Sequence, residues 1–381
     1  MPTARELALL QLVHARPGTT RAEAAATLSA SSGTVTGLVR SLAASALLDE
    51  QPAPPSGARG RPTRSLGPHA QGPLVLVGVV SHEAWQLRLT QLGGSAMAAA
   101  EGHHEGMAGD RLVAELAEAA GELARPVAGR VRGVGVALPG VVRGTVLVDA
   151  PLLGWHGLDV APVARSLAAA PGAAEPILVV GNDATLAALG EAVRGAAQAA
   201  ALHLHLYLDA GLGGALTHGG DVVPSALGVG GEFGHMPFGE PGAPCPCGAT
   251  GCWTTSVGAL PLARALGEPL PQDAVSYARR VVGRARDGDA AAHAAVAQVA
   301  TSLGRGLAGL VNGLDIDIVT LGGWAPEIAG ALPDALMGAY VDGLMRFRRA
   351  SPPPLVAGRL GPDAPLVGAQ EQVWARLWSR L

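Results

Sequence analysis

The sequence of 381 residues contains no lysine, so arginine supplies all 27 of its basic side chains. A lysine amine is the working group of a P-loop, of a Schiff-base nucleophile and of a protein-kinase-type phosphate site. The composition therefore excludes these three kinds of active site.

Long apolar runs are also missing, although apolar residues make up 49% of the chain. Glycine, proline and charged residues interrupt every run before the roughly 18 residues that a membrane-spanning helix needs. The first 18 residues lack the apolar stretch and the small-residue cleavage site of a secretory signal. We therefore expect a cytoplasmic protein without a membrane segment, divided into two or three compact units of about 100–200 residues each.

Cysteine is scarce, and all three cysteines fall in one segment rich in glycine and proline, close to a histidine. An odd number of clustered thiols does not suit a disulfide framework, which fits a reducing compartment. Thiolate and imidazole are donors that suit a four-coordinate zinc, and a Cys₃His set leaves no open position for water. We predict one structural zinc held by His235, Cys245, Cys247 and Cys252; the alternative is three reduced thiols beside a solvated histidine.

Positive charge is concentrated at the N-terminus. Residues 1–66 contain seven arginines and four acidic residues, a net charge of +3, whereas the whole chain carries −4 and the remainder therefore −7. A small basic unit joined to an acidic body indicates an anionic partner for the N-terminal region alone.

The same N-terminal region shows three short helical patterns, over residues 5–13, 20–28 and 32–47. Thr20 and Glu23 form a capping box at the start of the second pattern. Two short helices joined by a tight turn, the second polar on its outer face, are typical of a helix-turn-helix. The residues of the third helix that we expect to touch DNA are Ser32, Thr34, Thr36 and Arg40.

A stretch rich in proline and glycine follows, over residues 49–64, and carries interleaved arginines. We interpret it as a wing, a β-ribbon whose tip brings Arg59 and Arg61 to phosphates or to a narrow minor groove. The alternative is a three-helix scaffold followed by an ordinary linker. Because one winged module buries little surface, we expect a homodimer, or a dimer of dimers, on a palindromic duplex DNA operator.

The rest of the chain alternates between buried strands and helices, which predicts a two-lobed α/β body. The expected strands and hairpins cover residues 74–80, 85–94, 131–140, 177–182, 202–220 and 318–323, and the clearest helices cover residues 110–124 and 183–191.

The segment from Glu232 to Cys252 resembles the zinc-loop signature of the ROK family (repressors, open reading frames and kinases). That signature is ExGHM followed about ten residues later by CxCGxxGC and Leu-Glu; here Trp253 and Thr254 replace the Leu-Glu pair. The N-terminal stretch, with its Gly-Arg-Pro wing, resembles the winged helix-turn-helix that precedes the ROK domain in the repressor branch.

The resemblance covers about residues 70–375 of the body and implies an actin-like ATPase (ribonuclease H-like) fold, with two lobes and a cleft between them. The expected division is a winged helix-turn-helix over residues 1–70 and a ROK domain over residues 71–381. Lobe one would take about residues 71–190 plus a C-terminal helix over 365–381, and lobe two about residues 191–364, with the zinc loop at 235–252.

The resemblance also implies a sugar pocket. The run ALPGVVRG and the run PLLGWHG at 151–157 look like the family's sugar-side loop, and AGLGG at 210–214 looks like its second phosphate loop. In NDAT at 182–185 the aspartate matches the family's catalytic base, a role that suits a carboxylate at a strand end. The implied ligand-binding residues are Asn182, Asp183, Glu232, His235 and Thr254. The alternative is that Asn182 and Asp183 only cap the helix that follows.

The first phosphate loop departs from the family. Its kinases carry Asp-x-Gly-Gly-Thr after the first strand, whereas residues 78–83 read GVVSHE. Backbone amides cannot approach a phosphate closely past such bulky side chains, and phosphoryl transfer depends on that positioning. We therefore expect no kinase activity. Asp183 would be a vestigial base that accepts a hydrogen bond from a hydroxyl group of a ligand.

Three functional hypotheses remain. The leading one is a DNA-binding repressor that responds to a sugar or sugar phosphate through a degenerate kinase body. The second is an ATP-dependent sugar kinase with a divergent phosphate loop. The third is a protein-interaction scaffold whose pocket is vestigial.

Overall fold

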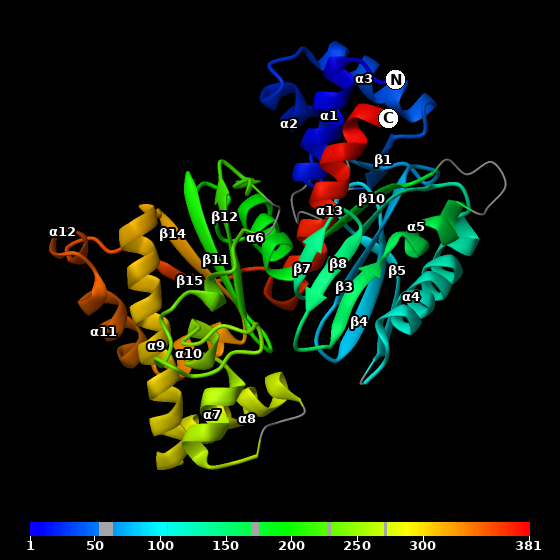
Figure 1. Ribbon diagram of the computed structural model, residues 1–381. Helices are drawn as coiled ribbons and strands as arrows, with labels where there is room; N and C mark the ends of the chain where they lie inside the picture. The colour runs from blue at the N-terminus through cyan, green and yellow to red at the C-terminus, as the bar shows by residue number, and fades with distance from the viewer. Residues whose placement is uncertain (53–63, 105, 169–174, 227–229, 270–272) are drawn as a thin grey trace.

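The computed structural model describes residues 1–52, 64–104, 106–168, 175–226, 230–269 and 273–381. The chain folds into an N-terminal module and two lobes, with the N- and C-termini close together at the module (Figure 1).

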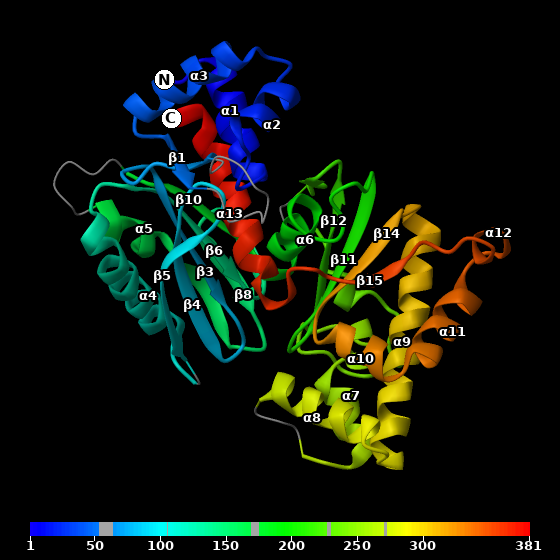
Figure 2. The same cartoon turned by 180° about the vertical axis from the view of Figure 1, so that it is seen from behind.

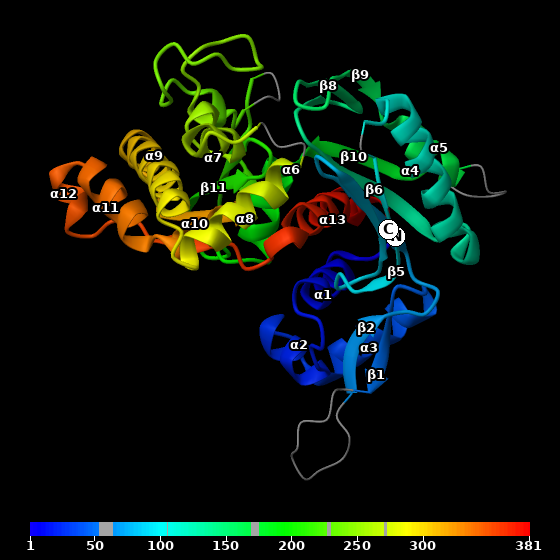
Figure 3. The same cartoon turned by 90° about the horizontal axis from the view of Figure 1, so that it is seen from below.

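The N-terminal module consists of three helices and a two-stranded antiparallel ribbon (Figure 3). Its elements are α1 (Ala4–Ala15), α2 (Arg21–Thr27), α3 (Ser32–Ala44), β1 (Leu48–Pro52) and β2 (Arg64–Pro68). The three predicted helices and the capping box of Thr20 and Glu23 are confirmed. The third helix ends at Ala44, earlier than expected, because Ala46 adopts a left-handed backbone conformation with φ of 55°. The predicted wing residues Arg59 and Arg61 lie outside the described residues.

Lobe one is built on a five-stranded sheet in the order β10-β6-β3-β4-β5. Strands β10, β6 and β3 are parallel, whereas β3, β4 and β5 form antiparallel hairpins. A small antiparallel sheet, β7-β8-β9, is inserted between β6 and β10. The elements are β3 (Leu74–Val80), β4 (Ala84–Thr90), β5 (Ala96–His103), α4 (Gly109–Ala124), β6 (Val131–Leu138), β7 (Val141–Arg143), β8 (Val146–Ala150), β9 (Trp155–Asp159), α5 (Ala161–Ala168), β10 (Ile177–Asn182) and α6 (Asp183–Val193).

Lobe two repeats this strand arrangement with the order β13-β12-β11-β14-β15. Again two antiparallel hairpin pairs are followed by two parallel strands. The repeat of one topology in two sheets produces the two-lobed α/β body predicted from the sequence. The elements are β11 (Leu202–Leu208), β12 (Leu212–His218), β13 (Asp221–Val222), α7 (Ala259–Leu266), α8 (Ala274–Arg286), α9 (Ala290–Leu314), β14 (Ile318–Gly323), α10 (Ala325–Ala331), α11 (Pro333–Gly343), α12 (Arg346–Arg349) and β15 (Leu355–Ala357).

Helix α9 corrects one expectation from the sequence. Within the described part of the chain it alone is long and apolar enough to span a membrane, with a mean hydropathy of 1.2 over 18 residues. Its many alanines keep the average high despite the charge of Arg305. Most of that window is buried, and its apolar side chains form the core of lobe two, which is the arrangement of a core helix.

Helix α13 (Ala364–Leu377) returns from lobe two and packs on β3, β6 and β10 of lobe one. It also lies along α6, which in turn packs on β11 and β12, so these two helices lie between the sheets of the two lobes (Figure 2). Their close approach requires glycine: a Cβ at Gly190 would lie 2.5 Å from the carbonyl oxygen of Ala364.

A buried ionic cluster joins the N-terminal module to these two helices. Glu371 of α13 lies 3.2 Å from Nε2 of His14 in α1 and accepts a hydrogen bond of 3.0 Å from Nε of Arg194. Arg194, the C-cap of α6, also donates to the carbonyl oxygen of Ala15 at 2.8 Å. The backbone N–H of Gly93 donates to Nδ1 of His14 at 3.0 Å. The module is thereby fixed to both α6 and α13.

Candidate metal centre and ligand cleft

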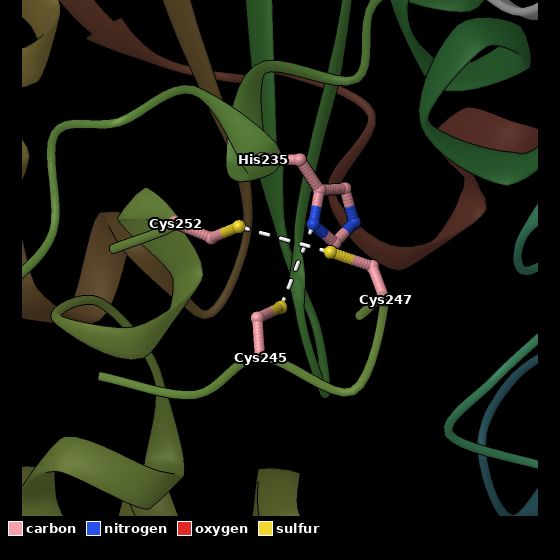
Figure 4. Close-up of side chains that lie close together, drawn as sticks. All are labelled: His235, Cys245, Cys247 and Cys252. Carbon is pink, nitrogen blue, oxygen red and sulfur yellow. Dashed lines mark hydrogen bonds between the residues drawn. The ribbon is translucent and has the colours of Figure 1, made fainter. Parts of the chain in front are cut away.

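The four predicted metal ligands converge on one point. His235 comes from a 3₁₀ turn after β13, and the three cysteines come from the loop that follows it (Figure 4). The potential ligand atoms of His235, Cys245, Cys247 and Cys252 all lie within 4.8 Å of one another. Nδ1 of His235 is 3.6 Å from Sγ of Cys245, and the sulfurs of Cys247 and Cys252 are 3.7 Å apart. The sulfur–sulfur distance is that of two ligands around one tetrahedral ion, not that of a disulfide bond.

Local backbone structure holds the cysteines in place. The N–H of Cys245 donates to the carbonyl oxygen of Ala249 at 3.0 Å, and Gly248 turns the chain with φ of 93°. Trp253, directly after the last cysteine, is fully buried in the core of lobe two and donates to the carbonyl oxygen of Ser302 at 3.2 Å. Gly306 of α9 leaves space for its indole ring. Trp253 therefore anchors the cysteine loop to the body.

The donor set fits a closed zinc site. Burial raises the pKa of the Cys245 thiol and raises that of Cys252 to about 12. Without a cation these sulfurs would remain protonated near neutral pH, whereas a divalent ion binds them as thiolates and releases protons. Three thiolates and one imidazole complete a tetrahedral shell and leave no position for a reactive water.

A cleft of about 210 Å³ lies next to this centre, between the two lobes. The β3–β4 turn, the loop after β8 and the start of α6 line it from lobe one, and the β11–β12 turn and the cysteine loop line it from lobe two. Besides Cys245 and Cys247, the polar side chains of its lining are His82, Asn182, Asp183, Tyr207, Asp209, Glu232, His235, Thr254 and Thr255. All five ligand-binding residues predicted from the sequence thus border one cleft.

Asn182 and Asp183 have different tasks at the start of α6. Oδ1 of Asn182 accepts from the N–H of Thr185 at 2.9 Å, and its Nδ2 donates to the carbonyl oxygen of Gly140 at 3.1 Å. Asn182 is therefore the N-cap of α6, as the capping alternative predicts for this residue. Oδ1 of Asp183 accepts from the N–H of Ala184 at 2.8 Å, but no described residue bonds its second oxygen. That oxygen is available to a ligand in the cleft.

The cleft is rich in carboxylates that burial destabilises in their charged form. Burial raises the pKa of Asp183 to about 7, and the charge of Asp209 adds to the rise. Burial likewise raises the pKa of Asp209, whereas the nearby imidazole of His82 opposes the rise. Burial lowers the pKa of His82, against the attraction of Asp209. Burial also raises the pKa of Glu232.

Sequence reasoning missed Asp209 and treated His82 only as an obstacle in the β3–β4 turn. Asp209 directly precedes the AGLGG bend, so a carboxylate at the entrance to a glycine-rich turn was the available signal. Its proximity to His82 could not be read from the sequence, because the two residues belong to turns of different lobes.

The β3–β4 turn is closed by its own hydrogen bonds. The N–H of Ser81 donates to the carbonyl oxygen of Ala84 at 2.8 Å, and the N–H of Ala84 donates to Oγ of Ser81 at 3.2 Å. Nε2 of His104 contacts the carbonyl oxygen of Ser81 at 2.9 Å. Both amides are therefore used inside the turn and do not form a phosphate cradle.

The predicted DNA-contacting residues lie along α3. Ser32 and Arg40 are exposed, whereas Thr34 and Thr36 are half-buried. Oγ1 of Thr36 donates to the carbonyl oxygen of Ser32 at 2.9 Å. Because that bond ties its hydroxyl to the helix, Thr36 is less free to reach a base than Ser32 or Arg40.

Known proteins with similar sequences include both kinases and repressors. The chain is 30% identical over 215 residues to a glucokinase of Halalkalibacterium halodurans, a match that covers 52% of this chain and 63% of the kinase. It is 25% identical over 226 residues to a xylose repressor of Caldicellulosiruptor bescii, covering 56% of this chain and 55% of the repressor. The chain thus spans between half and two-thirds of the length of these relatives.

Solved structures give the fold. A ROK family transcriptional regulator, a homologue of the E. coli MLC protein, superposes with a TM-score of 0.75 at 20% identity, over 99% of this chain and 98% of the regulator. A ROK hexokinase from Thermus thermophilus superposes with a TM-score of 0.62 at 28% identity, over 80% of this chain and 99% of the hexokinase. The predicted α/β fold of the ROK sugar kinases is confirmed. Because the sequence model of the ROK family matches residues 101–375, most of the chain, this protein belongs to the ROK family.

Proposed function

We propose that this protein is a DNA-binding transcriptional repressor whose ROK body binds a sugar and does not phosphorylate it. The observation that carries the proposal is the N-terminal module of three helices and a ribbon, bonded to the ROK body by the buried cluster of His14, Arg194 and Glu371. The superposition over almost the whole chain with a ROK transcriptional regulator supports it.

DNA binding would use the outer face of α3 as the reading helix of a winged helix-turn-helix. Ser32, Thr34, Thr36 and Arg40 are the candidates for contact with base edges or with the backbone. Residues 53–63 connect β1 to β2, and their arginines would add a sequence-independent attraction to phosphates. The active species would be a homodimer, or a dimer of dimers, on a palindrome.

The β3–β4 turn supports the proposed absence of kinase activity. The amides of Ser81 and Ala84 are bonded within the turn, and His82 borders the cleft beside it. Asp183 would accept a hydrogen bond from a sugar hydroxyl, and because a pKa of about 7 also suits a general base, the proposed loss of turnover rests on the β3–β4 turn and not on Asp183.

The metal would be structural. His235, Cys245, Cys247 and Cys252 would hold one zinc, whose role when bound is to fix the loop beside the cleft. Through that loop the zinc would position Glu232 and Thr254 for the ligand. A cytoplasmic location would suit such a cluster, because a reducing compartment keeps its thiols from forming disulfides.

A sugar kinase is the second candidate. Relatives named glucokinase and the retained Asn182 and Asp183 at the edge of the cleft favour it. A coupled kinase assay with common hexoses and N-acetylated amino sugars separates the two functions, because the proposal expects no turnover above background.

The decisive experiment is a fluorescence-anisotropy titration with DNA from upstream of the protein's own gene, at two salt concentrations. We expect binding that weakens steeply with salt and disappears when residues 1–66 are deleted. Arg40→Ala should weaken operator binding more than random-DNA binding, whereas the distant exposed arginine in Arg125→Ala serves as a control. If the deletion leaves binding unchanged, the N-terminal module is not the reader and the proposal is wrong.

A further inference from the structure

The charge of the cleft restricts the ligand beyond the proposed function, on which this inference rests. Three carboxylates, those of Asp183, Asp209 and Glu232, border the same cavity. Among its described lining residues there is no arginine, and the imidazoles of His82 and His235 are the only basic groups. His235 belongs to the metal cluster, so His82 alone remains to neutralise an anionic ligand.

The position of Asp209 argues against a phosphate group in the cleft. It follows β11 and opens the glycine-rich bend that, in sequence, resembles a phosphate-binding loop. Its own N–H donates to the carbonyl oxygen of Gly211 at 2.9 Å, which removes one amide from any phosphate cradle. Arg279 acts on Asp209 electrostatically, but it lies outside the cleft lining and is paired with Glu327 at 2.8 Å. A carboxylate therefore occupies the place where a phosphate would need donors.

The small size of the cleft increases the effect of its negative charge on ligand binding. The cleft has a volume of about 210 Å³, so any charge on a bound ligand lies near the carboxylates that line it. Such a charge would be weakly screened from the buried Asp183 and the half-buried Asp209, and more strongly screened from Glu232, whose side chain is 45% exposed. The volume is also below the about 300–1,000 Å³ of sites that enclose drug-sized ligands, so it suits a monosaccharide and not a nucleotide.

We propose that the cleft binds a small unphosphorylated sugar and prefers a cationic amino sugar, and that Asp209 excludes sugar phosphates and nucleotides. The second oxygen of Asp183 accepts a hydrogen bond from a ligand hydroxyl, while the positive charge of the sugar's ammonium group compensates the negative charge of the carboxylates. A phosphate dianion meets the like charge of these carboxylates and loses its hydration.

The test uses the full-length, zinc-loaded protein and calorimetric titration with D-glucosamine, D-glucose and D-glucose 6-phosphate. We expect glucosamine to bind about tenfold more tightly than glucose, and glucose 6-phosphate to bind more weakly than either. Asp209→Asn should remove most of the preference for glucosamine and improve the binding of glucose 6-phosphate. Asp221→Asn, on an exposed strand outside the cleft, is the matched control and should change neither.

The possible outcomes distinguish a failure of this inference from a failure of the proposed function. If glucose 6-phosphate binds the unaltered protein as tightly as glucose, or glucosamine shows no advantage, the charge argument is overturned while sugar binding stands. If Asp209→Asn behaves like the Asp221 control, Asp209 is not the selecting group and the inference also fails. If none of the three compounds binds, both the inference and the sugar response of the proposed repressor are wrong, whereas the DNA titration still tests the reading module.

Discussion

Replacing Glu371 by glutamine should loosen the attachment of the N-terminal module to the body. Glu371 is the centre of the cluster that joins α1, α6 and α13, and its side chain is only 9% exposed. Its partners are also buried, with side-chain exposures of 5% for His14 and 15% for Arg194. Glutamine keeps the shape of the side chain but removes the charge.

The loss of stability in Glu371→Gln can be estimated from the hydrogen bonds that each partner keeps. Removing one member of a buried ion pair costs about 3–5 kcal/mol, because the remaining charge is left uncompensated. Arg194 keeps its bond to the carbonyl oxygen of Ala15, and the glutamine amide still offers one acceptor. We therefore expect a loss near the lower limit, about 3 kcal/mol.

The assay combines thermal denaturation with hydrogen exchange of the α1 amides. Glu371→Gln should lower the melting temperature and the protection of α1, whereas Glu122→Gln should do neither. Glu122 pairs with Arg125 at 4.0 Å on the surface of α4, where an ion pair contributes little. Unchanged protection of α1 in Glu371→Gln would refute the reasoning, since the cluster would then not hold the module.

The stability loss caused by Glu371→Gln should become smaller at low pH. Burial acts to raise the pKa of Glu371, but the hydrogen bond from His14 and the charge of Arg194 outweigh it and lower the pKa below its ordinary value of 4.5. A carboxyl with a lowered pKa stabilises the fold above about pH 4.5 and loses that contribution as the pH falls through the folded-state value. The difference between the unaltered protein and Glu371→Gln should therefore be constant near neutral pH and shrink below pH 4.5.

The remaining predictions concern the metal, the cleft and the wing. Metal analysis should give about one zinc per chain, and Cys247→Ser should lose both metal and stability; a metal-free protein of full stability contradicts this. Asp183→Asn should raise the melting temperature at pH 8 and not at pH 4. A carboxyl whose pKa rises to about 7 on folding destabilises the fold as the pH increases from about 4 to 7. A stability difference that does not depend on pH would refute the raised pKa. Robust sugar phosphorylation that Asp183→Asn abolishes would establish the kinase in place of the repressor. Arg61→Ala should weaken binding to operator and random DNA equally and reduce its salt dependence, whereas a loss confined to the operator would mean that the wing reads sequence.

The features that could be predicted from the sequence are the local ones. The metal cluster lies within eighteen residues, so its spacing was readable without a structure. The capping box of Thr20 and Glu23 and the N-cap Asn182 depend on neighbours only three positions away. Alternation of strands with helices likewise indicated the two-lobed body, because each buried strand has its own apolar pattern.

The features that could not be predicted join distant positions. His14 and Glu371 are 357 positions apart, and neither carries a local motif. The sequence does not indicate the inserted sheet β7-β8-β9, because its strands, of three to five residues, are too short to show a period. The sequence similarly could not place His82 beside Asp209, since only the packing of the two lobes around α6 and α13 brings their turns together.

Helix α6 connects the cleft with the cluster at Glu371, which gives Glu371→Gln a second expected effect. The helix begins at Asp183, at the edge of the cleft, and ends at Val193, with Arg194 as its C-cap, and its eleven residues span about 16 Å. Close packing at Gly190 leaves it little freedom to bend independently of α13. A ligand that shifts the start of α6 must therefore move Arg194 with it, and Arg194 is bonded both to Glu371 and to the backbone of α1. We accordingly expect Glu371→Gln to retain its affinity for the sugar in calorimetry while the sugar loses its influence on DNA binding in anisotropy. An unchanged influence would show that the two sites communicate by another route, or that α6 does not move.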